Sequence, residues 1–114
     1  MTTNPSAFRL ILTTAGTATQ ARDLARTLVT AKVAACVNVL PGMCSHYHWQ
    51  GELQEEAEVL LLIKTTADNV DEVQRLLTEH HTYDLPEFLV VHIDDGEPRY
   101  LSWLAEQCSS GPAS

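Results

Sequence analysis

The chain is poor in basic residues. Lys and Arg together number 7 against 15 Asp and Glu, so the 114 residues carry a formal net charge of −8. No segment concentrates Lys or Arg into a patch that could neutralise phosphates, and we therefore expect neither nucleic acid nor an anionic membrane as a partner. Long apolar runs are also missing, because the longest, Val59 to Ile63, is far too short to cross a bilayer. We expect a soluble, unexported protein.

Cysteines are few, odd in number and never spaced as C-x-x-C. Cys36, Cys44 and Cys108 therefore favour neither a disulfide framework nor a structural zinc site, and a reducing cytoplasm is the expected location. No motif presents an activated nucleophile. A thiol hydrolase using Cys36 or Cys44 with a histidine would need one, so we expect a protein that is not an enzyme.

Apolar periodicity and turn signals predict four extended regions and three helices. The first strand covers 8–14, and its Phe8, Leu10 and Leu12 are expected to face the core. Thr17 and Gln20 have the spacing of a capping box for a helix over 18–32. The second strand is expected to end at the Pro41-Gly42 turn. The remaining predictions are an extended region over 44–64, a helix up to His80, a strand over 87–93 and a helix from Pro98.

This order is β-α-β-β-α-β with an added C-terminal helix, which predicts an α+β, ferredoxin-like split βαβ fold with an antiparallel sheet. We expect one domain over 1–114, ordered over about 7–107, with a disordered tail over 109–114. Within the extended region, 59–63 has the continuous apolar pattern of a strand that is buried on both faces.

The first half of that extended region is polar and aromatic, and alternation places its side chains on two sides. Ser45, Tyr47 and Trp49 share one side. A domain of this size cannot cover such a projecting ribbon, so we infer that it packs against neighbouring subunits, with Tyr47, Trp49 and Cys36 in the contacts. The acidic run ELQEEAE is interpreted as a solvated edge.

The segment EHHTYDLPEF (79–88) carries two histidines and a carboxylate around Pro86. One interpretation is structural, because histidine is favourable at a helix C-terminus and proline stops the helix. The other is a divalent-ion site made by His80 and Glu87, with His81 as a further ligand, since imidazole suits copper and zinc. A second candidate is Cys44, His46 and His48, which share one strand face.

Five segments occur in the order and spacing found in the divalent-cation tolerance proteins called CutA: AACVNV, SHYHWQGEL, EEAEVLLLIKT, HHTYDLPE and YLSWL. The chain resembles this family over about 10–104. The resemblance implies a homotrimer similar in architecture to the PII signalling proteins, with long β-hairpins wrapping adjacent subunits. It also implies binding of copper or another divalent ion and a role in divalent-cation tolerance.

The resemblance further implies a copper ligand at the end of the first strand, where the family has cysteine and this chain has Thr13. A threonine hydroxyl replaces the soft thiolate that selects Cu(I). Two alternatives to metal binding stay open: a PII-like sensor of a small molecule, and a trimeric scaffold or anchor without a ligand.

Overall fold

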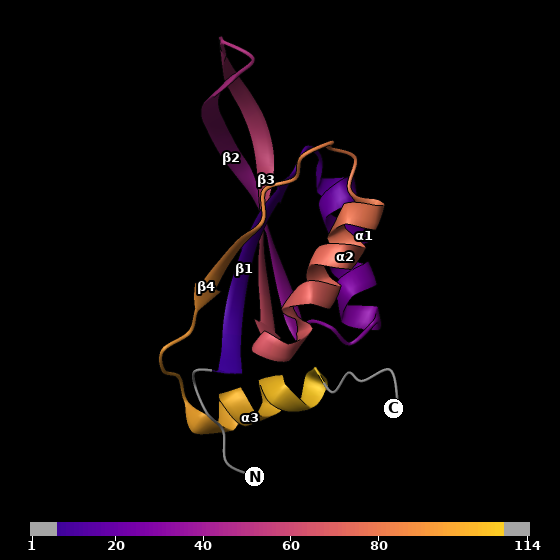
Figure 1. Cartoon of the computed structure of the whole chain (residues 1–114), viewed down its shortest axis with the longest axis vertical. Coiled ribbons are helices and arrows are strands. Elements are labelled where there is room, and N and C mark those ends of the chain that lie inside the picture. Colours follow the sequence, from indigo (N-terminus) through magenta and orange to yellow (C-terminus); the bar gives the residue numbers. More distant parts are fainter. Residues whose placement is uncertain (1–6, 109–114) are drawn as a thin grey trace.

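The computed structural model describes residues 7–108, so the expected disordered tail over 109–114 lies outside the described residues. Figure 1 shows the arrangement of the elements. The strands are β1 (Phe8–Ala15), β2 (Cys36–Trp49), β3 (Glu52–Thr66) and β4 (Leu89–His92). The α-helices are α1 (Ala18–Thr30), α2 (Val70–His80) and α3 (Pro98–Gln107), and a short 3-10 helix, η2 (Ala67–Asn69), precedes α2. No helix within 7–108 is long and apolar enough to cross a membrane.

The four strands form one antiparallel sheet in the order β2-β3-β1-β4. β1 is therefore central, between β3 and β4, as the split βαβ arrangement requires. Helices α1 and α2 lie side by side on one face of the sheet, and α3 lies across its lower end (Figure 1). The predicted α+β, ferredoxin-like fold with an added C-terminal helix is confirmed.

The core fills the space between the sheet and the helices α1 and α2. Alternate residues of β3 face it, namely Val59, Leu61 and Ile63, and they pack against Leu24 of α1 and Leu77 of α2. The remaining buried members of this cluster are Ile11, Ala15, Ala21, Leu28, Val33, Ala34 and Val73. Burying each Val, Leu or Ile side chain of this cluster contributes about 1.5–3 kcal/mol.

The predicted inner face of β1 is wrong. Ile11 and Thr13 are fully buried on the helix side, whereas Leu10 and Leu12 are only half-buried on the other. Both faces of this strand carry large apolar residues, so alternation could not identify the inner one. The polar Thr13 is accommodated inside because its hydroxyl has a hydrogen-bond acceptor. The segment Val59 to Ile63 was predicted to be buried on both faces, but within this chain it is fully buried on one face only.

The other face of the sheet carries an apolar surface that we call the open face. Directly paired residues lie on the same side of a sheet, and the strand register therefore groups its members. They are Leu10, Leu12, Leu40, Leu60, Leu62, Leu89 and Val91. Leu40, Leu89 and Val91 are exposed. Helix α3 packs Leu101 and Leu104 against Phe8 and so covers the lower end of the sheet.

Strands β2 and β3 run on past the body of the molecule as a long hairpin, which accounts for a longest dimension of 50 Å (Figure 1). Gln50 and Gly51 both have positive φ, 52° and 83°, the pattern of a two-residue type I′ turn. The predicted end of the second strand at Pro41-Gly42 is wrong. The ladder shifts register between Leu40 and Met43 and continues, because proline and a bulge are tolerated in an edge strand.

Candidate functional site

The two adjacent histidines at the end of α2 have different surroundings. The helix ends at His80, as predicted, and His81 has an extended backbone. His80 is exposed, and its Nε2 lies 3.9 Å from the Glu79 carboxylate. His81 instead points toward the end of β1, with its Nε2 2.7 Å from the carbonyl oxygen of Thr14. Because the helix ends between them, the two rings have different neighbours.

Both ring nitrogens of His81 take part in hydrogen bonds. The backbone N–H of Tyr83 donates to His81 Nδ1 at 3.0 Å, so Nδ1 must carry a lone pair. The carbonyl of Thr14 can only accept, and Nε2 must therefore carry the proton. His81 is thus a neutral imidazole in the Nε2–H tautomer. It can bind a metal ion only after giving up one of these bonds.

Gln20 fixes the turn that follows His81. The Thr17 hydroxyl accepts from the Gln20 backbone N–H at 3.1 Å, which confirms Thr17 as the cap of α1 but gives only half of the predicted capping box. The Gln20 side chain reaches the turn, where its Oε1 accepts from the backbone N–H and the hydroxyl of Thr82. Its Nε2 donates to the carbonyl oxygen of His80. The sequence indicates the helix cap but gives no signal for this long-range contact.

Thr13, near the end of β1, is fully buried. Its hydroxyl donates to the backbone carbonyl oxygen of Glu87 at 2.6 Å. The Glu87 side chain is exposed and lies near Glu58. Partial burial raises the pKa of the Glu87 carboxyl, and the negative charge of Glu58 raises this pKa further. The end of β1 and Glu87 are therefore neighbours, as a metal site between them would require.

A groove of about 770 Å³ lies where the hairpin leaves the body, between the hairpin and the segment 83–89. Three structural groups line it: hairpin residues Ser45, His46, Tyr47, Trp49, Glu56 and Glu58, turn residues Tyr83, Asp84, Leu85, Pro86, Glu87, Phe88 and Leu89, and Thr14 of β1. Most of the polar residues that line the groove are acidic, and four of its lining residues are aromatic, namely Tyr47, Trp49, Tyr83 and Phe88. We call this space the acidic groove.

Glu58 is the buried acid of the acidic groove, with 8% of its surface exposed. The Tyr83 hydroxyl donates to its Oε2 at 2.7 Å, and the Tyr47 hydroxyl donates to Glu56 at 2.8 Å. Burial, together with the Glu58 carboxylate, raises the pKa of Tyr83 far above its usual value. The interpretation of the acidic run as a solvated edge is therefore wrong for Glu58. This residue lies at the base of the hairpin, where the strand is covered by the rest of the molecule.

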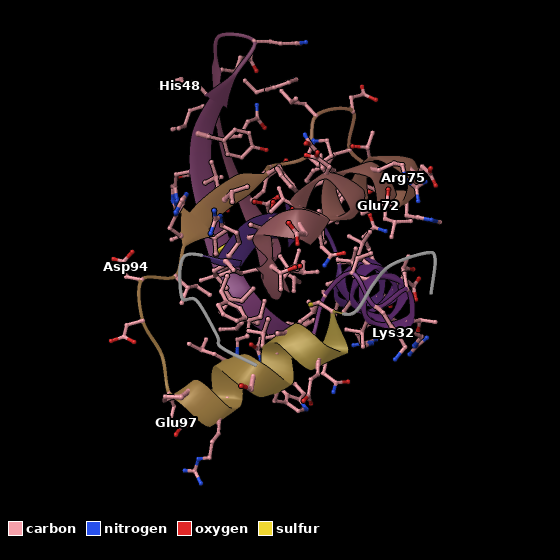
Figure 2. The ribbon with its side chains drawn as sticks, turned by 60° about the horizontal axis from the view of Figure 1, so that its bottom comes forward. Lys32, His48, Glu72, Arg75, Asp94 and Glu97 are labelled. Carbon is pink, nitrogen blue, oxygen red and sulfur yellow. The ribbon has the colours of Figure 1, made fainter. Side chains whose placement is uncertain are left out.

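The second candidate cluster lies on the hairpin. Cys44, His46 and His48 pair across the strands with Ala57, Glu55 and Leu53, and His46 lies 3.3 Å from Glu55. Figure 2 places His48 on the projecting part of the hairpin. Within residues 7–108, no three His, Cys, Asp or Glu side chains are grouped closely enough to hold a metal ion.

The expected contact residues are available on the surface of this chain. Tyr47 and Trp49 are exposed by 38% and 48%, and Cys36 is half-buried on the same side of the sheet as Leu62. The exposure of Tyr47 and Trp49 agrees with the uncovered ribbon that the sequence indicated, whereas the role of all three residues in subunit contacts stays a prediction. The sequence did not indicate that Tyr47 and Trp49 would also line the acidic groove.

Fold and site together define a small α+β protein with a ferredoxin-like sheet, a projecting β-hairpin and an acidic groove at the base of that hairpin. The family model for the CutA1 divalent ion tolerance protein matches residues 9–107. The chain belongs to this family, and its relation to divalent-cation tolerance follows from that membership.

Two relatives and one solved structure illustrate the similarity. The divalent-cation tolerance protein CutA of Yersinia pestis (strain Pestoides F) is 42% identical over 95 residues, which cover 83% of this chain and 80% of that protein. A CutA homolog from Danio rerio is 38% identical over 97 residues, covering 85% of this chain but 65% of the longer relative. The crystal structure of CutA1 from Oryza sativa aligns with a TM-score of 0.92 at 33% identity, covering 97% of this chain and all of that one.

Proposed function

We propose that this protein is a cytoplasmic, non-catalytic homotrimer that binds a divalent metal ion, copper in the first instance, and contributes to divalent-cation tolerance. The observation that carries the proposal is the pair of neighbouring carboxylates, Glu87 and Glu58, beside the end of β1. A cation relieves the repulsion between two neighbouring carboxylates. Partial burial raises the pKa of Glu87, and the negative charge of Glu58 raises it further.

The proposed ligands are Glu87, His80 and His81. Carboxylate and imidazole donors suit Cu(II) and Zn(II), whereas the thiolate that favours Cu(I) is replaced by Thr13. His80 is exposed, and it would have to turn from Glu79 toward Glu87 to bind the ion. His81 would have to exchange its bond to Tyr83 or to Thr14 for the metal. This exchange is a cost, and it predicts modest affinity.

The open face supports assembly of several copies. Leu89 is 54% exposed and Val91 is 42% exposed, next to half-buried Leu10 and Leu12. A contiguous apolar surface of this kind on a small protein typically marks a protein interface. The long hairpin supports the same conclusion, because its outer half contacts little of its own body (Figure 1).

Calorimetric titration of Cu(II) and Zn(II) into the metal-stripped oligomer tests the proposal, with the mass confirmed by light scattering. We expect a saturable isotherm that Glu87→Gln and His80→Ala each weaken. His92→Ala is the matched control, because His92 is an exposed histidine on β4 that is outside the turn. Absence of a saturable isotherm, or equal weakening by the control, would contradict metal binding at this site.

A further inference from the structure

The loop that joins β4 to α3 holds the only Asp-Gly pair of the chain, and no asparagine of the chain precedes a glycine. Asp94, Asp95, Gly96 and Glu97 are all exposed. Figure 2 shows Asp94 and Glu97 at the two ends of this loop, at the margin of the molecule. Three of these four residues are carboxylates in a chain whose net charge is −8, and the repulsion between like charges disfavours burial of the loop in contacts between copies.

The side chain of Asp95 lies against the backbone of the next residue. Its Oδ1 atom accepts a hydrogen bond from the Gly96 backbone N–H at 2.8 Å. The Gly96 nitrogen therefore lies beside the Asp95 Cγ atom, which is bonded to that oxygen. Within residues 7–108, no backbone carbonyl accepts from this N–H, so no helix or strand bond holds the nitrogen away from the carboxyl. Because glycine has no Cβ atom, no side chain obstructs the approach.

We propose that Asp95–Gly96 is a site of spontaneous isoaspartate formation in the folded protein, and that the modification loosens the start of α3. The Gly96 nitrogen attacks the Asp95 Cγ atom and forms an N–Cγ bond, while the carboxyl hydroxyl leaves with the amide proton as water. The product is a cyclic succinimide. When water adds back, cleavage of the N–Cγ bond restores aspartate, whereas cleavage of the bond from the nitrogen to the main-chain carbonyl carbon gives isoaspartate. Water is the only co-reactant, and it is released once and taken up once.

The effect on α3 follows from the contacts of the loop. Isoaspartate lengthens the main chain by one methylene directly before Gly96. A Cβ atom on Gly96 would lie 3.1 Å from the Leu101 side chain, so this segment packs closely on the start of the helix. The next residue, Glu97, caps α3, because its Oε1 accepts from the backbone N–H groups of Arg99 and Tyr100 at 2.8 and 3.0 Å. Displacing these contacts removes support from the first turn of α3.

Ageing of the metal-stripped oligomer in mildly acidic buffer tests the proposal. Isoaspartate is measured by methyl transfer from S-adenosylmethionine with a protein isoaspartate methyltransferase, and peptide mapping assigns its position. The chain unfolded in guanidinium gives the reference rate. We expect the folded oligomer to form isoaspartate at Asp95 within about tenfold of that rate, since misplacing the attacking nitrogen would slow the reaction about a hundredfold. Ageing in heavy-oxygen water should also label Asp95, because opening of the succinimide takes up an oxygen from water.

Asp95→Glu is the blocking variant. Its longer side chain would have to close a larger ring, so its methyl incorporation should stay at the background of fresh protein, although the charge is kept. Asp94→Glu is the matched control and should keep the parent rate, because Asp94 is followed by an aspartate and not by a glycine. Hydrogen exchange of the Leu101 and Leu104 amides should be faster in the isomerised protein than in fresh protein, and ageing of Asp95→Glu should not change it.

Three results would overturn the proposal. Isoaspartate formation more than about tenfold slower in the folded oligomer than in the unfolded chain would show that the loop, or a contact between copies, holds the nitrogen away from the carboxyl. Parent-like methyl incorporation by Asp95→Glu would place the isoaspartate at another residue. Unchanged hydrogen exchange of α3 in the isomerised protein would remove the effect on the helix. The loop contains none of the proposed metal ligands, so these results and the copper titration are independent.

Discussion

The hydroxyl of Thr13 donates to the backbone carbonyl oxygen of Glu87 at 2.6 Å, across 74 positions of sequence. This bond ties the end of the central strand to the segment that carries Glu87 into the acidic groove. The Thr13 side chain is therefore committed to a structural hydrogen bond.

Thr13→Val should destabilise the protein by about 1–3 kcal/mol, because the partly buried carbonyl of Glu87 loses its donor while the shape of the side chain is kept. Urea denaturation measures the change. Thr27→Val is the control, since the Thr27 hydroxyl donates to the Asp23 carbonyl on the exposed surface of α1 and should change stability by no more than about 0.5 kcal/mol. Equal effects of the two substitutions would show that the Thr13 hydrogen bond adds nothing.

Substituting the two neighbouring histidines should have unequal effects. His81→Phe removes a hydrogen bond to Thr14 and another from Tyr83, and we expect a loss of about 2 kcal/mol or more. His80→Phe changes an exposed side chain and should stay within about 0.5 kcal/mol. Independently, nitrogen chemical shifts of His81 should identify the neutral Nε2–H tautomer in metal-free protein. Detection of the Nδ1–H tautomer would contradict the hydrogen-bond assignment.

Glu87 should make stability depend on pH. Its folded-state pKa is raised, by partial burial first and by Glu58 second. The folded protein therefore binds this proton more tightly than the unfolded chain, and the stabilisation it gives is lost as pH rises through the folded pKa. Glu87→Gln should raise the melting temperature at pH 7 and have a smaller effect below about pH 4, the region of an ordinary glutamate pKa. If Glu87→Gln raised the melting temperature more at acid pH than at pH 7, this would contradict a raised pKa of Glu87 in the folded protein.

The fold was predictable from the sequence because its signals are local. Period-two alternation identified the strands, the Thr17 cap identified the start of α1, and Pro98 identified the start of α3. The register shift near Pro41 was not predictable, because an edge strand tolerates a proline that would end a central one. The inner face of β1 was not predictable, because both faces carry large apolar residues and the buried Thr13 is polar.

The candidate site was predictable only in part, for the same reason. The segment 79–88 could be identified from its histidines and carboxylates, but their directions depend on Gln20 and Thr14, which approach from other elements. Glu58 was hidden within an acidic run, because neighbouring residues in a strand alternate between solvent and groove and only the tertiary fold decides where burial begins.

The open face makes the proposed homotrimer testable with two valines of equal exposure. Val91 on the open face and Val29 on α1 are each 42% exposed. If subunits pack on the open face, Val91→Glu should lower the mass measured by light scattering toward that of the monomer, because a buried carboxylate there would have no partner. Val29→Glu should leave the mass unchanged. A Val91→Glu protein that keeps the parent mass would place the subunit contacts elsewhere, and a monomeric parent would remove the trimer from the proposed function.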